Sequence, residues 1–171
     1  MKRESIILIG FMGSGKTTVG MRLSYKIRRP VEDLDKMIER REACTISELF
    51  ATKGEEYFRE KETELLRELV RKKRQGILSA GGGTPMRQQN RDLLKQLGTV
   101  VYLRVRPETV YERLKWDKSR PLLQCKDPLS RIQELMESRA GAYESCADII
   151  VDADELDLDE IQNRILRRLT K

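Results

Sequence analysis

The chain has 171 residues, of which 39% are hydrophobic and 36% are charged, and its formal net charge is +6. This length predicts a single domain spanning residues 1–171, and the apolar fraction is too high for a disordered chain. Three cysteines without a Cys-x-x-Cys pair, in a sequence without histidine, exclude a common zinc site and predict free thiols in a reducing compartment. The apolar run near the start is too short for a signal peptide or a membrane span, so we expect a cytoplasmic protein without a membrane partner.

Lysines and arginines gather in clusters at the ends of segments with helical periodicity. A cation there stabilises the negative end of the helix dipole, so we interpret the clusters as dipole partners on a solvated surface. Nucleic-acid binding is the weaker alternative, and we expect no nucleic-acid partner. An enzyme of anionic substrates would also carry a basic excess. The clusters are Arg28-Arg29, Arg40-Arg41, residues 71–74 and Arg167-Arg168.

Five short apolar segments alternate with longer segments of helical periodicity. Such alternation predicts an α/β fold, in which a parallel sheet carries helices on both faces. Ligands of such a sheet bind at the carboxyl ends of its strands, so the residues after each strand are the candidate site. The predicted strands are residues 5–9, 30–34, 76–80, 99–105 and 148–151.

The first predicted strand leads into GFMGSGKTT, residues 10–18. A glycine, any four residues and then Gly-Lys-Thr is the pattern of a loop whose backbone N–H groups bind phosphate. A helix beginning near Lys16 would add the positive end of its dipole. We therefore expect Lys16 to reach the β- and γ-phosphates of a nucleotide and the Thr17 hydroxyl to hold Mg²⁺. A glycine-rich turn with a surface lysine is a much weaker alternative, because an amphipathic segment follows the loop.

Two acids, Asp33 and Asp35, follow at the end of the second predicted strand. The two-residue period of a strand would place both carboxylates on one face, pointing into one cleft. The third strand ends in glycine and the fourth in arginine, so Asp33 is the candidate that supports Mg²⁺, directly or through water. Asp35 would contact a substrate hydroxyl and accept its proton, because the chain has no histidine for this task. The alternative is two solvent-facing acids that cap the next helix.

Helix signals continue along the chain. A capping box that starts at Thr45 predicts a helix, and Gly54 predicts its end. Arg59 lies near the start of the next helix, where the dipole disfavours a cation, so we expect it to pair with an anion. The three glycines of residues 81–83 follow the third strand and predict a backbone that approaches a ligand closely, with a tight turn as the alternative.

The polar segment 115–126 contains the only tryptophan and predicts a mobile lid. Within it Arg120, directed by Pro121, would neutralise charge on a transferring phosphate. The alternative is that Trp116 packs permanently against the domain. Arg139 is expected to end a helix, where a role as dipole partner and a role as anion ligand are equally favoured.

Taken in order, these segments resemble the shikimate kinases over nearly the whole chain. The resemblance rests on residues 10–18, Asp33-x-Asp35, 54–59, 81–83, 120–123, and Arg139 with Tyr143. It implies transfer of the ATP γ-phosphate to the 3-hydroxyl of shikimate, on the route to chorismate and the aromatic amino acids. It also implies the fold of the nucleoside monophosphate kinases, with strand order 2-3-1-4-5.

The resemblance also assigns roles residue by residue. Lys16, Asp35 and Arg120 would be catalytic, and Thr17 and Asp33 would hold Mg²⁺. An adenine contact after the last strand cannot be placed, because the acidic residues 152–156 do not align. Shikimate would be bound by Asp35, Arg59, Gly82 and Arg139, around a helical region at about 35–62. ATP would be bound by Gly13, Ser14, Gly15, Lys16, Thr17, Thr18, Arg113 and the lid residue Arg120.

Other functions stay open at this point. One is a kinase of another small polyol acid such as gluconate, or of a nucleoside monophosphate, against which Arg59, Arg139 and the two acids argue. Another is a nucleotide-dependent binding protein without turnover, against which Lys16 argues. We expect a monomer with a small-molecule substrate.

Overall fold

The computed structural model describes residues 5–119 and 124–170. Its centre is a five-stranded parallel sheet with the order β2-β3-β1-β4-β5. The α/β class and the strand order implied by the resemblance are therefore confirmed, and each predicted strand is correct to within one residue at either end. The strands are β1 (Ser5–Ile9), β2 (Val31–Asp33), β3 (Ile77–Ser79), β4 (Gly98–Arg104) and β5 (Ile149–Asp152).

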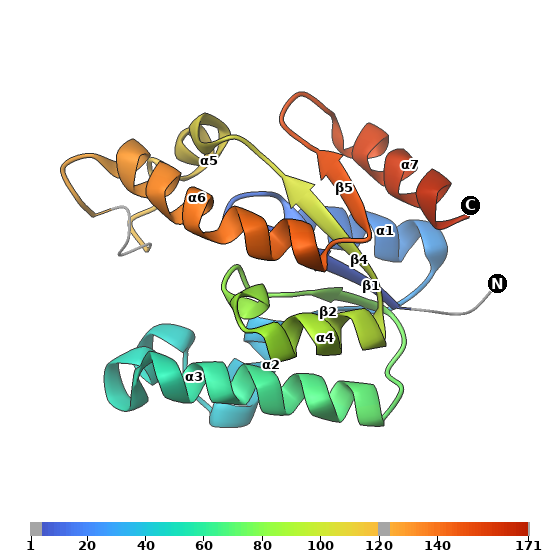
Figure 1. The fold of residues 1–171 in the computed structure, drawn as a ribbon, viewed down its shortest axis with the longest axis horizontal. Coiled ribbons are helices and arrows are strands. Elements are labelled where there is room, and N and C mark those ends of the chain that lie inside the picture. Colours follow the sequence, from blue (N-terminus) through green and yellow to red (C-terminus); the bar gives the residue numbers. More distant parts are fainter. Residues whose placement is uncertain (1–4, 120–123, 171) are drawn as a thin grey trace.

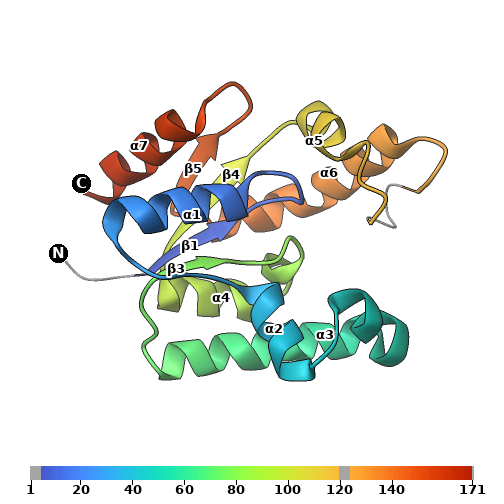
Figure 2. The same ribbon diagram turned by 180° about the vertical axis from the view of Figure 1, so that it is seen from behind.

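The helices of the described part of the chain are α1 (Lys16–Ile27), α2 (Leu34–Glu42), α3 (Ile46–Arg71), α4 (Gln88–Leu97), α5 (Pro107–Leu114), α6 (Pro128–Cys146) and α7 (Leu158–Leu169). Figure 1 shows α4 and α6 in front of the sheet, and Figure 2 shows α1 and α7 in front of the opposite face. α3 packs on α2 and α4, and α5 packs on α6. A short 3₁₀ helix, η1 (Thr84–Met86), joins β3 to α4.

β1 is the most enclosed strand, because it pairs with β3 on one side and β4 on the other. All five of its residues are buried, as expected of a strand with helices on both faces. Phe11, just beyond it, is 1% exposed and extends the core into the loop that follows. The loop of residues 10–15 therefore starts from the buried centre of the sheet.

Helix starts follow the capping signals. Thr45 and Glu48 form the predicted reciprocal capping box, and Asp127 and Asp157 each accept a hydrogen bond from the third residue beyond. Gly54 differs from the prediction: it has φ +83° and ψ 169°, but the helix resumes directly after it. Gly54 therefore kinks α3 rather than ending it, because a single left-handed residue breaks the hydrogen-bond ladder for only one turn.

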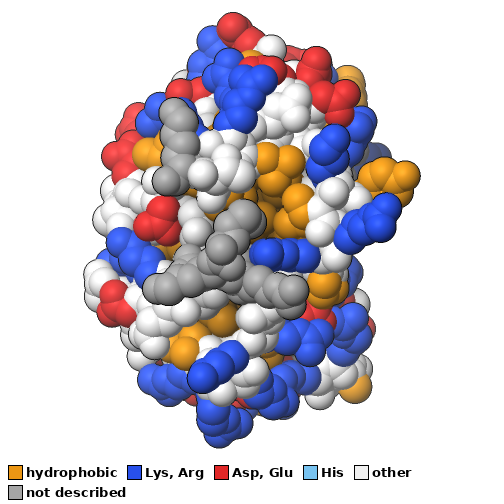
Figure 3. All heavy atoms as spheres, turned by 90° about the vertical axis from the view of Figure 1, so that its right-hand side faces the viewer, with side chains coloured by type: hydrophobic (Ala, Val, Ile, Leu, Met, Phe, Trp, Pro, Cys, Tyr) orange, Lys and Arg blue, Asp and Glu red, His pale blue; other side chains and the backbone are white. Residues whose placement is uncertain are grey.

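Three basic clusters lie at the carboxyl ends of α1, α3 and α7. Helices that follow strands run back along the sheet, so these helix ends lie beside the amino ends of the strands. Figure 3 shows this side of the molecule, with lysine and arginine side chains gathered along its rim. The clusters thus lie on the side opposite the loop of residues 10–15. Among the described residues, no helix combines the length and apolar character needed to cross a membrane.

The predicted lid, residues 115–126, lies between α5 and α6. Arg120 and Pro121 fall outside the described residues, so lid closure and the role of Arg120 stay predictions. Trp116 is 84% exposed, which contradicts the alternative that it packs permanently against the domain.

Candidate active site

The loop after β1 has the geometry of a phosphate cradle. Gly15 adopts φ +95° and directly precedes α1, so the first helical N–H groups face the loop. A Cβ on Gly10 would lie 2.7 Å from the carbonyl oxygen of Leu103, which leaves room for glycine alone. The Lys16 ammonium curls back over the loop and donates to the carbonyls of Gly10 (2.8 Å) and Phe11 (3.1 Å). The cation is thereby placed at the positive end of α1, where an anion binds best.

Two further side chains complete the cradle. The Ser14 hydroxyl is buried and has no hydrogen-bond partner among the described residues, so it is available to a ligand in the loop. Arg113, on α5, donates to the carbonyl of Gly13 over 2.7 Å. This contact places its guanidinium at the outer edge of the loop. Thr17 and Thr18 lie exposed in the first turn of α1.

The three glycines of residues 81–83 each lie against one of the predicted substrate residues. A Cβ on Gly81 would lie 2.9 Å from Asp35 Oδ1, and one on Gly82 would lie 3.5 Å from the Arg139 guanidinium. A Cβ on Gly83 would overlap the guanidinium of Arg59. A Cβ on Gly82 would also lie 3.7 Å from the Gly10 carbonyl oxygen and from the Met12 backbone nitrogen. The loop is the tight turn of the alternative, since the Thr84 N–H donates to the Gly81 carbonyl over 3.1 Å, and its close approach to a ligand stays a prediction. It lies between the phosphate cradle and a carboxylate with two guanidinium groups.

The sequence suggested that Asp33 and Asp35 share one face of a strand, but the structure places only Asp33 in the strand. β2 ends at Asp33, whose Oδ1 accepts from the Lys36 N–H (3.1 Å) and caps α2, while Asp35 lies in the first helical turn. Asp33 therefore caps the next helix, as the alternative expected, and its role in supporting Mg²⁺ stays a prediction. The strand argument fails because this cap starts the helix at Leu34, so a helical turn rather than a strand period sets where Asp35 points.

The Asp35 carboxyl is largely buried and lies among charged side chains. Its Oδ1 is buried without a hydrogen-bond partner among the described residues. Burial first, and then the negative charges of Asp33 and Glu62, raise the pKa of Asp35 to about 6, although Lys16 and Arg59 lower it. A carboxylate with this pKa is a better proton acceptor than an exposed one and is still ionised at neutral pH.

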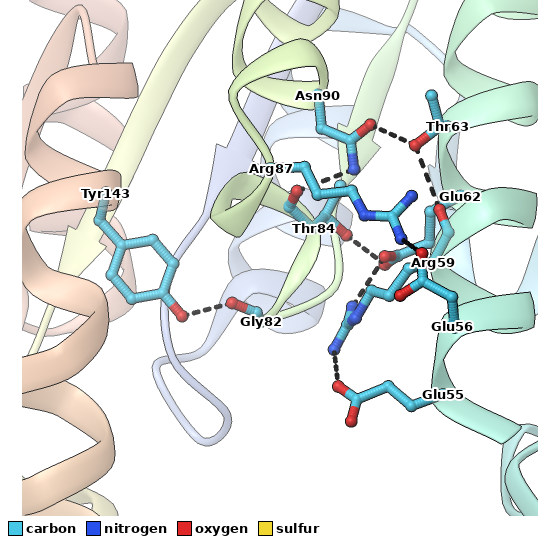
Figure 4. A network of polar contacts seen from close by, with 10 residues as sticks. All are labelled: Glu55, Glu56, Arg59, Glu62, Thr63, Gly82, Thr84, Arg87, Asn90 and Tyr143. Carbon is cyan, nitrogen blue, oxygen red and sulfur yellow. Dashed lines mark hydrogen bonds and ion pairs between the residues drawn. The ribbon is translucent and has the colours of Figure 1, made fainter.

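Arg59 is held by a buried acid that sequence reasoning missed (Figure 4). The Arg59 guanidinium donates to Glu62 Oε2 over 2.7 Å and pairs more weakly with Glu55 at 3.4 Å. The Glu62 side chain is 0% exposed, and its other oxygen accepts from the Thr84 hydroxyl at 2.5 Å. Asn90 then links the Thr84 carbonyl to the Thr63 hydroxyl, over 3.0 and 2.7 Å. The expectation that Arg59 pairs with an anion is met within the protein itself.

A sequence signal for Glu62 existed. It lies four residues after Phe58 and three before Leu65, on the buried stripe of α3. Glu62 also lies in a stretch of charged residues, where an acidic side chain is ordinarily exposed to solvent. This expectation outweighed the helical spacing that places Glu62 on the buried face. Asn90 and Thr84 carry no comparable signal, because their burial depends on how α4 meets α3.

Arg139 lies inside α6, which continues to Cys146, and not at the end of a helix. Gly141 lies in the interior of this helix, and a Cβ there would have no heavy atom within 4 Å. The Arg139 guanidinium lies 5.6 Å from the Phe11 ring centre. With a helix that continues beyond it, the dipole-partner interpretation is wrong. The position beside Gly82 favours an anion ligand instead.

The two predicted magnesium residues lie at helix starts, Thr17 in the first turn of α1 and Asp33 at the N-cap of α2. Their hydroxyl and carboxylate oxygens are ligands that Mg²⁺ prefers, so the donor chemistry fits. Within residues 5–119 and 124–170, no group of three or more acidic, cysteine or histidine side chains could hold a metal by itself. Any metal here would need further oxygens from a bound phosphate or from water.

Residues 152–156, which could not be assigned from sequence, tie two loops together. Asp154 accepts from the Arg106 N–H (2.7 Å) and from the Thr109 hydroxyl (2.6 Å), and so fixes the start of α5. Arg113 is on that same helix, so the acidic segment acts on the cradle by holding α5 in place.

The chain is similar to known proteins over nearly its whole length. The family model for shikimate kinase matches residues 12–170. The shikimate kinase of Dictyoglomus turgidum is 43% identical over 170 residues, covering 98% of both chains. The structure of the Acinetobacter baumannii shikimate kinase in complex with shikimate is 36% identical with a TM-score of 0.90, covering 98% of this chain and 93% of that one.

One more distant structure shares only the fold. A gluconokinase from Sinorhizobium meliloti is 18% identical with a TM-score of 0.58, covering 98% of this chain and 92% of that one. A shikimate kinase from Bacteroides thetaiotaomicron is 34% identical with a TM-score of 0.87, over 98% and 99% of the two chains. Full-length similarity, the matching family model and the arrangement of the site agree, and the chain belongs to the shikimate kinase family.

Proposed function

We propose that this chain transfers the γ-phosphate of ATP to the 3-hydroxyl of shikimate, in the cytoplasm and as a monomer. The observation that carries the proposal is the glycine loop, residues 81–83, which lies against Asp35, Arg139 and Arg59 and also against the phosphate cradle. A phosphate donor and a carboxylic acid with hydroxyl groups would thus meet in one place.

Acceptor recognition follows from the chemistry of the three side chains. Guanidinium groups bind a planar carboxylate through paired N–H donors, and Arg59 and Arg139 approach from α3 and α6. Asp35 offers acceptor oxygens to hydroxyl groups at the other end of the same loop. The backbone of Gly82 contributes a contact to the ring, because no side chain separates it from a ligand.

On the donor side, the backbone of residues 13–18 and the Ser14 hydroxyl would bind the phosphates. Arg113 would lie near the adenine. Thr17 and Asp33 would hold Mg²⁺, which when bound neutralises charge on the β- and γ-phosphates. Lys16 would exchange its contacts with the loop carbonyls for phosphate oxygens, which are stronger partners for an ammonium.

The reaction is an in-line displacement. The acceptor oxygen forms a bond to the γ-phosphorus, and the bond from that phosphorus to the bridging oxygen of ADP breaks. The hydroxyl proton passes to Asp35, whose raised pKa suits this role. Because the transition state is loose, the carboxylate also serves by orienting the hydroxyl before it attacks.

The direct test is ADP formation from ATP, measured with shikimate, with gluconate, with AMP and without an acceptor. We expect turnover with shikimate alone. Equal turnover with gluconate would favour the alternative of a kinase for other polyol acids. ADP formation that no acceptor increases would overturn the assignment.

Loss of either substrate arginine is expected to raise the KM for shikimate by about thirtyfold, since each supplies charge-assisted hydrogen bonds to the carboxylate. Arg139→Ala tests the contribution of Arg139. For Arg59, Ala would leave the buried Glu62 without its partner, so Arg59→Lys is preferable because it keeps the charge and loses the paired donors.

Matched controls lie eight residues away on the same helices. Arg67→Ala on α3 and Arg131→Ala on α6 remove exposed arginines and should leave both KM values unchanged. If Arg139→Ala and Arg59→Lys also left the KM for shikimate unchanged, the acceptor would not be held by its carboxylate.

A further inference from the structure

Tyr143 is a buried tyrosine that the roles assigned so far do not use. It lies on α6, is 1% exposed, and its hydroxyl donates to the carbonyl oxygen of Gly82 over 2.5 Å. Figure 4 shows this hydrogen bond crossing from α6 to the glycine loop. Its ring packs on Tyr102 of β4, with centres 5.0 Å apart, so the hydroxyl is aimed by a rigid support.

The residue one helical turn earlier on α6 is Arg139, and its guanidinium interacts electrostatically with the same hydroxyl. Guanidinium groups only donate, and the phenol proton goes to Gly82, so the oxygen lone pairs of Tyr143 are left for the neighbouring Arg139 cation. Burial raises the pKa of Tyr143 to about 12, although Arg139 lowers it, so the phenol keeps this proton at every pH at which the enzyme works. Tyr143 thus lies between Arg139 and Gly82, and the nearby guanidinium polarises the hydroxyl that donates to the Gly82 carbonyl.

The hydrogen bond to Gly82 also fixes a peptide plane. Without side chains, residues 81–83 have little to hold their backbone dihedral angles. The carbonyl of Gly82 and the N–H of Gly83 belong to one planar peptide and point in opposite directions. Drawing the carbonyl towards α6 therefore turns the Gly83 N–H away from α6, to the side on which Arg59 lies against Gly83.

We propose that Tyr143 is a positioning residue for the acceptor, which sets the Arg139 guanidinium and the Gly82 peptide with one hydroxyl group. This inference rests on the proposed function, because it assigns the device to the shikimate half of the site. It joins two contacts that would otherwise be independent, one to the acceptor carboxylate and one to its ring. The nucleotide half of the site has no contact with this hydroxyl through any described hydrogen bond.

The test is Tyr143→Phe, which removes the hydroxyl and keeps the ring. We expect the KM for shikimate to rise about tenfold and the KM for ATP to stay within about twofold, because only acceptor contacts lose their alignment. Tyr102→Phe is the matched control: it removes the hydroxyl of the ring that packs on Tyr143, and it should leave both KM values unchanged. The melting temperature of each variant reports folding separately.

A double-mutant cycle supplies a second readout. If Tyr143 acts through Arg139, adding Tyr143→Phe to Arg139→Ala should raise the KM for shikimate by only about twofold more. Fully additive effects, an unchanged KM in the single variant, or equal rises in both KM values would each overturn the inference. Absence of shikimate-dependent ADP formation in the parent protein would instead overturn the proposed function, and this inference with it.

Discussion

Lys16→Ala is expected to lower kcat by about a thousandfold, because it removes the cation that meets charge developing on the transferred phosphate. The Lys16 ammonium contacts two loop carbonyls, of Gly10 and Phe11, and lies at the start of α1. It therefore serves the cradle and not the core. The loss of two partly exposed hydrogen bonds should reduce the melting temperature by only about 5 °C.

The comparison that isolates this effect is Lys26→Ala, which removes an exposed lysine from the last turn of the same helix. This variant should retain the kcat of the parent. Circular dichroism and melting curves on both variants separate catalysis from folding. A Lys16→Ala protein that keeps more than about a tenth of the parent kcat would contradict the assignment of Lys16 to the phosphates.

The fold was largely predictable because its signals are local. An apolar run that is buried on both sides, followed by a glycine-rich loop and an amphipathic segment, specifies β1, the cradle and α1 without reference to the rest of the chain. The caps at Thr45, Asp127 and Asp157 are equally local. Errors arose where two local rules competed, as at Asp33, where a strand period and a helix cap both fitted the sequence.

The supporting parts of the site could not be predicted in the same way. Glu62 acquires its role only when α3 lies beside the glycine loop, and Asn90 only when α4 lies beside α3. Their partners are 22 and 27 residues away along the chain. Arg139 was placed at a helix end because Gly141 follows it, and only the packing of Tyr143 and Cys146 shows why the helix continues. Tertiary contacts decide such positions, and a single sequence contains no record of them.

Asp35→Asn is expected to lower kcat/KM for shikimate by about a thousandfold at pH 7.5, because the amide cannot accept the hydroxyl proton. In the parent, kcat/KM should fall below about pH 6, where the Asp35 carboxyl becomes protonated. Phosphate groups also titrate near pH 6, at about the same value. The fall of kcat/KM below about pH 6 can be assigned to Asp35 only if the residual kcat/KM of Asp35→Asn does not show the same fall.

Stability provides a readout that needs no nucleotide. The folded protein keeps the Asp35 proton up to about pH 6, whereas an unfolded chain releases it near the model value of 3.8. Between these values the folded state binds more protons, so the parent should lose stability as the pH rises from about 4 to about 6. The full shift corresponds to about 3 kcal/mol.

Asp35→Asn removes the buried charge, so the variant should melt about 8 °C above the parent at pH 8 and close to the parent at pH 4. Glu39→Gln, one turn further along α2, is the matched control and should change neither the activity nor the pH dependence of melting. If the difference in melting temperature between Asp35→Asn and the parent were the same at pH 4 and pH 8, the Asp35 carboxyl would not be desolvated in the folded protein. Higher stability and lower turnover in the same variant would show that the ionised Asp35 carboxylate destabilises the fold and is needed for the reaction. The same burial that makes the charged form unfavourable makes this carboxylate a stronger proton acceptor for the substrate hydroxyl.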